Sequence, residues 1–236
     1  MKKTEIIKIQ KQLATAGFYN GQPDGIWGPM TQAAWDASLD AATLRKEMEL
    51  PTSLATELNQ VAWSAKVSSL FIERVVWICQ ALGMPDRGPD YLMSCMAFET
   101  GETFSPSVKN ALSGATGLIQ FMPATARGLG TTIESLAKMT AEDQLNYVYK
   151  YFSPYKGRLK TLGDVYGAIL WPAAIGKSDE YVLWREKDSP TTYFQNRGLD
   201  VNKDGTITRK EFLVKINEKL DKGLRKPYCR VLATPT

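Results

Sequence analysis

The stretch 98–126 contains the residues whose types and spacing most suggest chemistry. A single carboxylate, Glu99, ends an apolar run, and a segment rich in small residues that carries Gln120 follows it. The whole chain of 236 residues contains no histidine. This absence excludes Ser-His-Asp triads, Cys-His proteases and His-ligated zinc hydrolases. Acid–base chemistry by a carboxylate remains available, and it is typical of enzymes that cleave glycosides.

Glu99 has a sequence context suited to a general acid. To protonate the leaving oxygen of a glycosidic bond, a carboxylic acid must keep its proton near neutral pH. Apolar neighbours such as Met96, Phe98, Phe121 and Met122 would disfavour the ionised form of Glu99 and raise its pKa. The alternative interpretation is a helix-terminal glutamate on a solvated face.

Glu102 lies three residues after Glu99 and could share a helix face with it. A surface position is the simpler interpretation of Glu102. The sequence therefore offers no certain second carboxylate, and a standard two-carboxylate glycosidase is not supported. A single acid instead suits a route in which the substrate itself assists the reaction.

Three motifs follow one another along this stretch: Glu99-Thr100, Phe104-Ser105-Pro106 and Gly114-Ala115-x-Gly117-Leu118-Ile119-Gln120-Phe121-Met122-Pro123-x-Thr125-Ala126. Their order and spacing resemble the catalytic core of the soluble-lytic-transglycosylase family, which shares the goose-type lysozyme fold. The resemblance extends roughly over residues 63–185 and is nearest to the phage endolysins. It implies that Glu99 acts first as general acid and then as base. It also implies that the N-acetyl group of the sugar stabilises the oxocarbenium-like centre, and that the sugar's 6-hydroxyl attacks to give a 1,6-anhydro product.

The glycine-rich part of this stretch is the expected saccharide groove. Small residues let backbone amides approach a sugar, and a glutamine side chain can both donate and accept hydrogen bonds. The candidate groove residues are Ser113, Gly114, Gly117, Leu118, Gln120 and Phe121. For any one of them, a tight packing turn is the alternative interpretation.

One region departs from the family pattern. Many members carry an Ala-Tyr-Asn-x-Gly motif late in the domain, whereas the corresponding residues 166–176 lack the Tyr-Asn pair. Tyr166 or Trp171 would then contact the sugar instead. The departure leaves open whether the sugar's own hydroxyl or a water molecule captures the intermediate, and so whether the enzyme is a transglycosylase or a hydrolysing muramidase.

A second resemblance lies near the N-terminus. The residues Gln10-x-x-Leu13, Gly17-Phe18-Tyr19-x-Gly21 and Pro23-Asp24-Gly25-Ile26-Trp27-Gly28-Pro29-x-Thr31 resemble the peptidoglycan-binding domain 1 family. The Asp24-Gly25 and Gly28-Pro29 pairs fit tight turns. The resemblance implies bacterial peptidoglycan as the partner, through a module whose candidate residues are Tyr19, Asp24, Gly25, Trp27 and Thr31. A small helical cap without a ligand is the alternative.

Residues 200–211 match the twelve-residue loop of an EF-hand, with Gly205 at the required turn. The expected ligands of one structural Ca²⁺ are Asp200, Asn202, Asp204, the carbonyl of Thr206 and the bidentate carboxylate of Glu211. Thr208 would add a hydroxyl or a bound water. Ser189-Pro190 and Gly198 interrupt the entering helix, so a paired sensor hand is not expected. A metal-free loop of the same shape is the alternative, and no cofactor is expected for catalysis.

The spacing of apolar residues predicts a mainly α fold. Helices are expected over 4–16, from Thr31, around 71–79 and over 91–98, 141–152, 161–170, 179–186 and 209–222. Residues 1–60 are expected to form a small three-helix peptidoglycan-binding domain, with the polar segment 39–60 as connector. Residues 61–236 are expected to form a lysozyme-like catalytic domain that includes the EF-hand-type loop 200–211.

The composition limits the classes of partner and the compartment that are expected for this protein. The net charge of +4 is too small and too dispersed to indicate nucleic acid, and it favours a polyanionic envelope only weakly. Cys79 and Cys95 lie in apolar helical patterns, and with Cys229 they lack paired spacing, which indicates reduced cysteines and a reducing compartment. No run approaches the ~20 apolar residues of a transmembrane helix, and no signal peptide is evident.

The leading hypothesis is a modular, monomeric phage-type endolysin that collects in the host cytoplasm and reaches the wall once another protein opens the membrane. A hydrolysing muramidase on the same fold is the nearest alternative, and a chitinase-like enzyme is a more distant one. A non-catalytic wall-binding or virion protein, in which Glu99 is vestigial, belongs to a different class.

Overall fold

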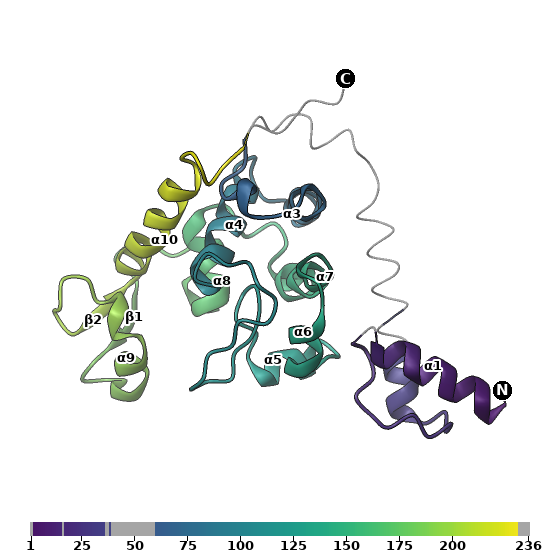
Figure 1. The fold of residues 1–236 in the computed structure, drawn as a ribbon. Coiled ribbons are helices and arrows are strands. Elements are labelled where there is room, and N and C mark those ends of the chain that lie inside the picture. Colours follow the sequence, from purple (N-terminus) through teal and green to yellow (C-terminus); the bar gives the residue numbers. More distant parts are fainter. Residues whose placement is uncertain (1, 16, 36–37, 39–59, 231–236) are drawn as a thin grey trace. The chain divides into compact units, whose positions relative to one another are not determined.

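The protein is described by a computed structural model that covers residues 2–15, 17–35, 38 and 60–230. These residues are mainly helical, which confirms the expected fold class (Figure 1). The chain divides into two compact units, Met1–Thr52 with Glu99–Tyr151 and Ser53–Phe98 with Phe152–Thr236. The expected connector 39–60 lies, apart from its last residue, outside the described residues.

In the first unit, the N-terminal module consists of the described residues between 2 and 38. Helix α1 (Lys3–Thr15) confirms the helix expected over 4–16. The second helix begins at Pro29, two residues before the expected start at Thr31. A proline at the first helical position is favourable, because its missing N–H would have no partner there. Leu13, Tyr19 and Ala34 form the buried core of the module.

The rest of the first unit consists of a long loop and three helices. These are α5 (Pro123–Gly128), α6 (Ile133–Lys138) and α7 (Ala141–Phe152), the last of which confirms the helix expected over 141–152. Thr132 caps α6 by accepting a hydrogen bond from the N–H of Ser135. Leu136, Leu145 and Val148 are fully buried, so α6 and α7 contribute their apolar sides to the core on which the loop rests.

The second unit contains a further group of helices. They are α3 (Ser69–Ala81), α4 (Gly88–Glu99), α8 (Leu162–Leu170) and α10 (Arg209–Gly223), with short 3₁₀ turns at Ser64–Lys66, Ser153–Tyr155 and Pro172–Ala174. The helices expected around 71–79 and over 91–98, 161–170 and 209–222 are confirmed. Helix α4 begins at Gly88, three residues earlier than expected.

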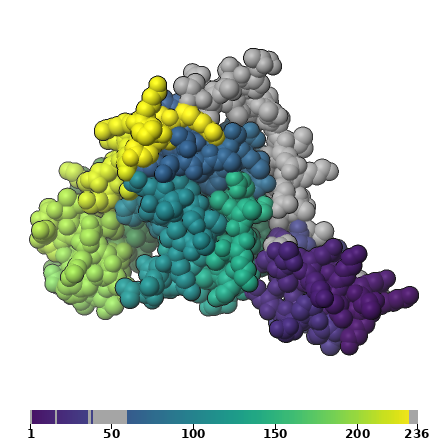
Figure 2. Space-filling model, in the orientation of Figure 1, coloured from purple at the N-terminus to yellow at the C-terminus, as the bar shows by residue number. Residues whose placement is uncertain are grey.

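The helix expected over 179–186 is wrong. This segment contains strand β1 (Val182–Arg185), which pairs antiparallel with β2 (Thr206–Thr208) through Trp184 opposite Ile207. The apolar run is short, and its pairing with Thr206–Thr208, which lie further along the chain, decides its conformation. Along the chain, helix α9 (Pro190–Asn196) and the 3₁₀ turn η5 (Arg197–Leu199) follow β1 and precede β2. Figure 2 shows this region, coloured yellow-green, as one continuous part of the surface.

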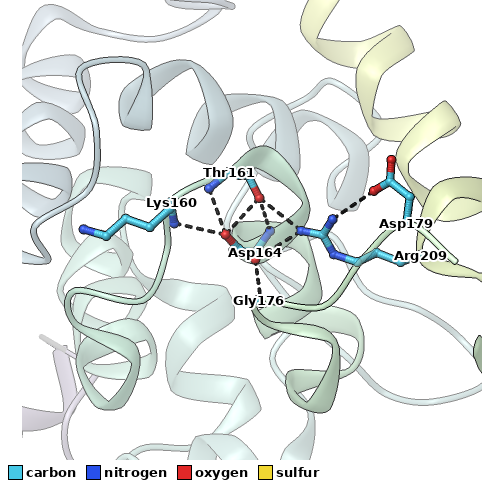
Figure 3. Close-up of polar contacts among 6 residues, drawn as sticks. All are labelled: Lys160, Thr161, Asp164, Gly176, Asp179 and Arg209. Carbon is cyan, nitrogen blue, oxygen red and sulfur yellow. Dashed lines mark hydrogen bonds and ion pairs between the residues drawn. The ribbon is translucent and has the colours of Figure 1, made fainter. Parts of the chain in front are cut away.

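A buried ion pair joins α10 to α8 (Figure 3). Asp164 and Thr161 form the capping box of α8, and Arg209, the first residue of α10, contacts Asp164 Oδ1 at 3.1 Å. Burial alone would raise the pKa of Asp164, but hydrogen bonds from Gly176 N–H and Thr161, together with the Arg209 charge, lower it. Arg209 also contacts Asp179 at 3.1 Å. Asp164 is therefore held ionised, and the two helix starts are fastened together.

Two further features concern the cysteines and the lengths of the helices. Cys79, Cys95 and Cys229 are buried, and none of them forms a disulfide within the described part of the chain. Burial raises the pKa of the Cys79 thiol. Over the ranges that the structure describes, no helix is both long enough and apolar enough to cross a membrane.

Candidate functional site

Glu99 is the last residue of α4, a helix whose side chains are almost all buried. The chain reverses directly after it through three residues of positive φ: Gly101 (58°), Glu102 (71°) and Phe104 (52°). Thr100 fixes this turn, because its hydroxyl accepts a hydrogen bond from Phe104 N–H at 3.0 Å. Non-glycine residues in this conformation are strained and tend to gather at functional sites. Glu102 lies beyond the helix end, so it does not share a helix face with Glu99.

The surroundings of Glu99 favour its neutral form. Its side chain is partly buried, and burial raises its pKa from 4.5 to about 8. The position at the carboxyl end of α4 acts in the same direction, because the helix dipole disfavours a negative charge there. Glu99 therefore carries its proton at neutral pH, as a general acid must.

The loop 105–121 is pinned from within the first unit by Gln144, a fully buried residue of α7. Its Oε1 accepts a hydrogen bond from Leu118 N–H at 2.7 Å, and its Nε2 donates to the carbonyls of Pro106 and Leu136. Gly117 has a φ of 87°, and a Cβ at this position would overlap the Gln144 side chain. Sequence reasoning missed Gln144, which resembles an ordinary polar residue of a surface helix.

The structure revises the expected groove. The side chains of Leu118 and Phe121 are buried at 0% and 1% exposure, so they pack into the core and cannot contact a sugar. Gln120 has a φ of 52°, and its side-chain amide donates to the carbonyls of Val108 and Gly117. It therefore holds the loop. Ser113 is exposed and Gly114 is half-buried, which leaves the tip of this loop as its accessible part.

Tyr166 and Trp171, the other candidate sugar contacts, belong to the second unit. Tyr166 lines a pocket of about 330 Å³. Its ring meets those of Phe98 and Phe212 edge-on, at 5.5 and 5.3 Å between centroids. Trp171 is 38% exposed and packs edge-on against Trp184. Sequence reasoning missed the polar residues of the same pocket, which include Gln195, Asn196 and Lys215.

In the N-terminal module, the buried side chain of Gln10 organises the turns. Its Nε2 lies 2.9 to 3.0 Å from Asp24 Oδ1, the carbonyl of Ile26 and Thr31 Oγ1, which share its two N–H donors. Its Oε1 accepts from Gly25 N–H at 2.9 Å. The hydrogen bond from Ile26 N–H, followed by that from Gln10, lowers the pKa of Asp24. One amide thus closes the whole turn-rich segment.

Residues 2–34 match the family model of a putative peptidoglycan binding domain. A search of curated proteins gave no match to the chain. The family match confirms the resemblance seen in this segment and supports peptidoglycan as a partner of a cell-wall-related protein.

The candidate residues of the peptidoglycan-binding module fall into two groups. Tyr19, Gly25 and Thr31 are buried, and Asp24, though exposed, accepts hydrogen bonds from Gln10 and Ile26. These four hold the fold of the module. Trp27 is partly exposed, and the neighbouring apolar side chains of Ile26 and Met30 are 64% and 60% exposed. Because these exposed apolar side chains lie within five residues of one another, the surface around Trp27 is the better candidate for contact with peptidoglycan.

The loop 200–211 is closed by hydrogen bonds from its own backbone to the Asp200 side chain. Asp200 lies at its centre and accepts hydrogen bonds from Lys203 and Gly205 N–H and from the hydroxyl of Tyr193, the last at 2.6 Å. Burial would raise the pKa of Asp200, but these hydrogen bonds lower it. The same Asp200 contact raises the pKa of Tyr193 to about 12. Strand β2 of the loop pairs with β1, not with a second loop of its own kind.

Proposed function

We propose that this protein binds peptidoglycan through residues 2–34 and cleaves the β-1,4 bond between N-acetylmuramic acid and N-acetylglucosamine. The observation that carries the catalytic part is the partly buried Glu99, whose pKa is raised to about 8. The family match to a putative peptidoglycan binding domain supports the choice of polymer. Joining the two activities in one chain raises the local concentration of the acid at the wall.

In the proposed reaction, Glu99 donates its proton to the glycosidic oxygen as the bond from that oxygen to the sugar C1 breaks. The carbonyl oxygen of the sugar's N-acetyl group stabilises the positive charge on C1. The Glu99 carboxylate then removes the proton of the attacking hydroxyl, which restores the acid. If this hydroxyl is the sugar's own 6-hydroxyl, the product is a 1,6-anhydro sugar.

A hydrolysing muramidase is the second candidate. Residues 166–176 lack the Tyr-Asn pair that many family members carry, so the identity of the attacking group stays open. In the muramidase reaction, water attacks in place of the sugar's 6-hydroxyl. The two reactions differ in product mass, because an anhydro end is one water lighter than a reducing end.

Replacing Glu99 with Gln tests the acid. The variant keeps the size of the side chain but has no proton to donate, so it should lose lysis of outer-membrane-permeabilised cells while its circular dichroism is unchanged. The matched control is Glu102→Gln, which removes a carboxylate three residues away and should retain lysis. A folded Glu99→Gln protein with full lytic activity would refute the assignment.

The wall-binding part is tested separately, by sedimentation of the full chain with purified peptidoglycan. Trp27→Ala should reduce the bound fraction, whereas Phe194→Ala, a change at an exposed aromatic residue (51% exposed) of the second unit, should not. If wild-type protein binds the wall but releases no fragments from it, the non-catalytic wall-binding alternative is correct.

A further inference from the structure

The loop 200–211 gathers oxygen atoms in the way that a hard cation requires. Ligand atoms of Asp200, Asp204 and Glu211 lie within 4.8 Å of one another. Oxygens that share one Ca²⁺ at 2.3–2.6 Å are separated by up to about 5 Å. The three converging donors are all carboxylate oxygens, which suit Ca²⁺ better than a transition metal.

An independent observation points to a ligand at this cluster. Glu211 is only 7% exposed, and its Oε1 has no hydrogen-bond partner among the described residues. The other oxygen, Oε2, accepts from the N–H and the hydroxyl of Thr208 in the capping box of α10. A buried carboxylate oxygen without a partner is unfavourable, and a cation held between Glu211 and the aspartates would satisfy it.

We propose that this loop binds one Ca²⁺ and that the ion holds the wall of the 330 Å³ pocket beside Phe98. The ligands assigned to the ion are Asp200, Asn202, Asp204, Thr206 and Glu211.

The first connection from the ion to the pocket runs through α9 and η5. Tyr193, on α9, donates its hydroxyl proton to Asp200 at 2.6 Å. The turn η5 ends at Leu199, directly before Asp200, and residues 195–199 supply four of the pocket's lining side chains or backbone groups. An ion that fixes Asp200 therefore fixes both ends of the segment that forms this wall.

The second connection runs through α10, which starts inside the loop. Glu211 lies in its first turn, and one turn further Lys215 lines the pocket. Phe212 packs edge-on against Tyr166, whose ring meets that of Phe98. Helix α9 contacts β1, and α10 contacts β2, on the two sides of the paired strands (Figure 1). The ion thus joins α9 and α10, whose residues line the pocket together with Phe98 and Tyr166. Phe98 directly precedes Glu99 in the chain.

The test uses the full chain after treatment with EGTA, with CaCl₂ or MgCl₂ then added back. Calcium at about a hundred times its Kd should raise the Tm by on the order of 5 °C, and magnesium should raise it less. Amide hydrogen exchange in residues 190–212 should become slower with calcium, while exchange in residues 141–151 of the first unit should not change. These readouts do not depend on wall cleavage, so they stand or fall separately from the proposed function.

Asp204→Asn is the variant of choice, because Asp204 is exposed and its loss should leave the fold intact. It should abolish most of the calcium-dependent rise in Tm. Asp221→Asn, at an exposed position of α10 outside the loop, is the matched control and should retain the rise. A wild-type Tm that ignores calcium, or an Asp204→Asn protein with the full rise, would overturn the site. A rise in Tm without slower exchange in residues 190–199 would overturn its role in holding the pocket.

Discussion

Replacing Glu99 with Gln should stabilise the folded protein, by an amount that grows with pH. In the folded state the pKa of Glu99 is about 8, against an ordinary value of 4.5. Between these two pH values the folded protein keeps a proton that the unfolded chain releases. Ionisation therefore favours the unfolded chain, and the stability of the wild type falls as pH rises. Glutamine has no proton to release, so the variant escapes this loss.

The size of the effect follows from the two pKa values. One pKa unit corresponds to about 1.4 kcal/mol. The loss is absent below the ordinary pKa of 4.5, reaches roughly 3 kcal/mol at pH 7 and approaches about 5 kcal/mol above pH 8. From pH 5 to pH 8, the free energy of unfolding of Glu99→Gln should gain about 3 kcal/mol over that of the wild type.

Urea unfolding of both proteins at pH 5, 6, 7 and 8 measures this difference directly. Glu73→Gln, which removes an exposed carboxylate from α3, reports the contribution of net charge alone. A difference between Glu99→Gln and wild type that stays constant from pH 5 to pH 8 would show that Glu99 is not held neutral by its surroundings, and the argument for a general acid would lose its basis.

Three further predictions concern activity and the hydrogen-bonded turns. The rate of wall lysis should fall as pH rises through about 8, because Glu99 then loses its proton; a pH–rate profile without a limb there would disagree. Gly117→Ala should lower the free energy of unfolding by about 2 kcal/mol or more, because its φ is 87° and the new methyl group meets Gln144; equal urea midpoints would contradict this. Gln10→Ala should leave buried partners such as Gly25 N–H unsatisfied and weaken sedimentation with peptidoglycan, whereas exposed Gln12→Ala should bind as the wild type does.

Much of the helical framework could be predicted from sequence, because long amphipathic runs define their own conformation. The helices α7, α8 and α10 lie within a residue or so of their expected bounds. The segment 179–186 could not be predicted in the same way, since its conformation depends on pairing with residues 206–208. Pro190 was expected to interrupt the helix before the EF-hand-type loop, yet it begins α9, because proline is well suited to a first helical turn.

The candidate site was partly predictable for a related reason. Glu99 could be predicted as the candidate acid from its residue type and from the absence of histidine. That prediction required no knowledge of contacts between residues distant in the chain. The directions of the side chains in loop 105–121 depend on left-handed backbone at Gly117 and Gln120 and on the hidden amide of Gln144. These place Leu118 in the core, where the sequence suggested a groove. In the N-terminal module, Gln10 is likewise recognisable as the central hydrogen-bonding residue only once the turns are folded around it.

The central claim is that Glu99 acts as an acid on the glycan strand of peptidoglycan, and mass analysis of the fragments released from purified peptidoglycan tests it most directly. Wild-type protein should release disaccharide-peptides that end in 1,6-anhydro sugars, and Glu99→Gln should release none under the same conditions. Fragments with reducing ends would show that water, and not the sugar's own hydroxyl, is the attacking group. They would leave the role of Glu99 as the acid unchanged. Release of the same fragments by a folded Glu99→Gln protein would contradict the claim.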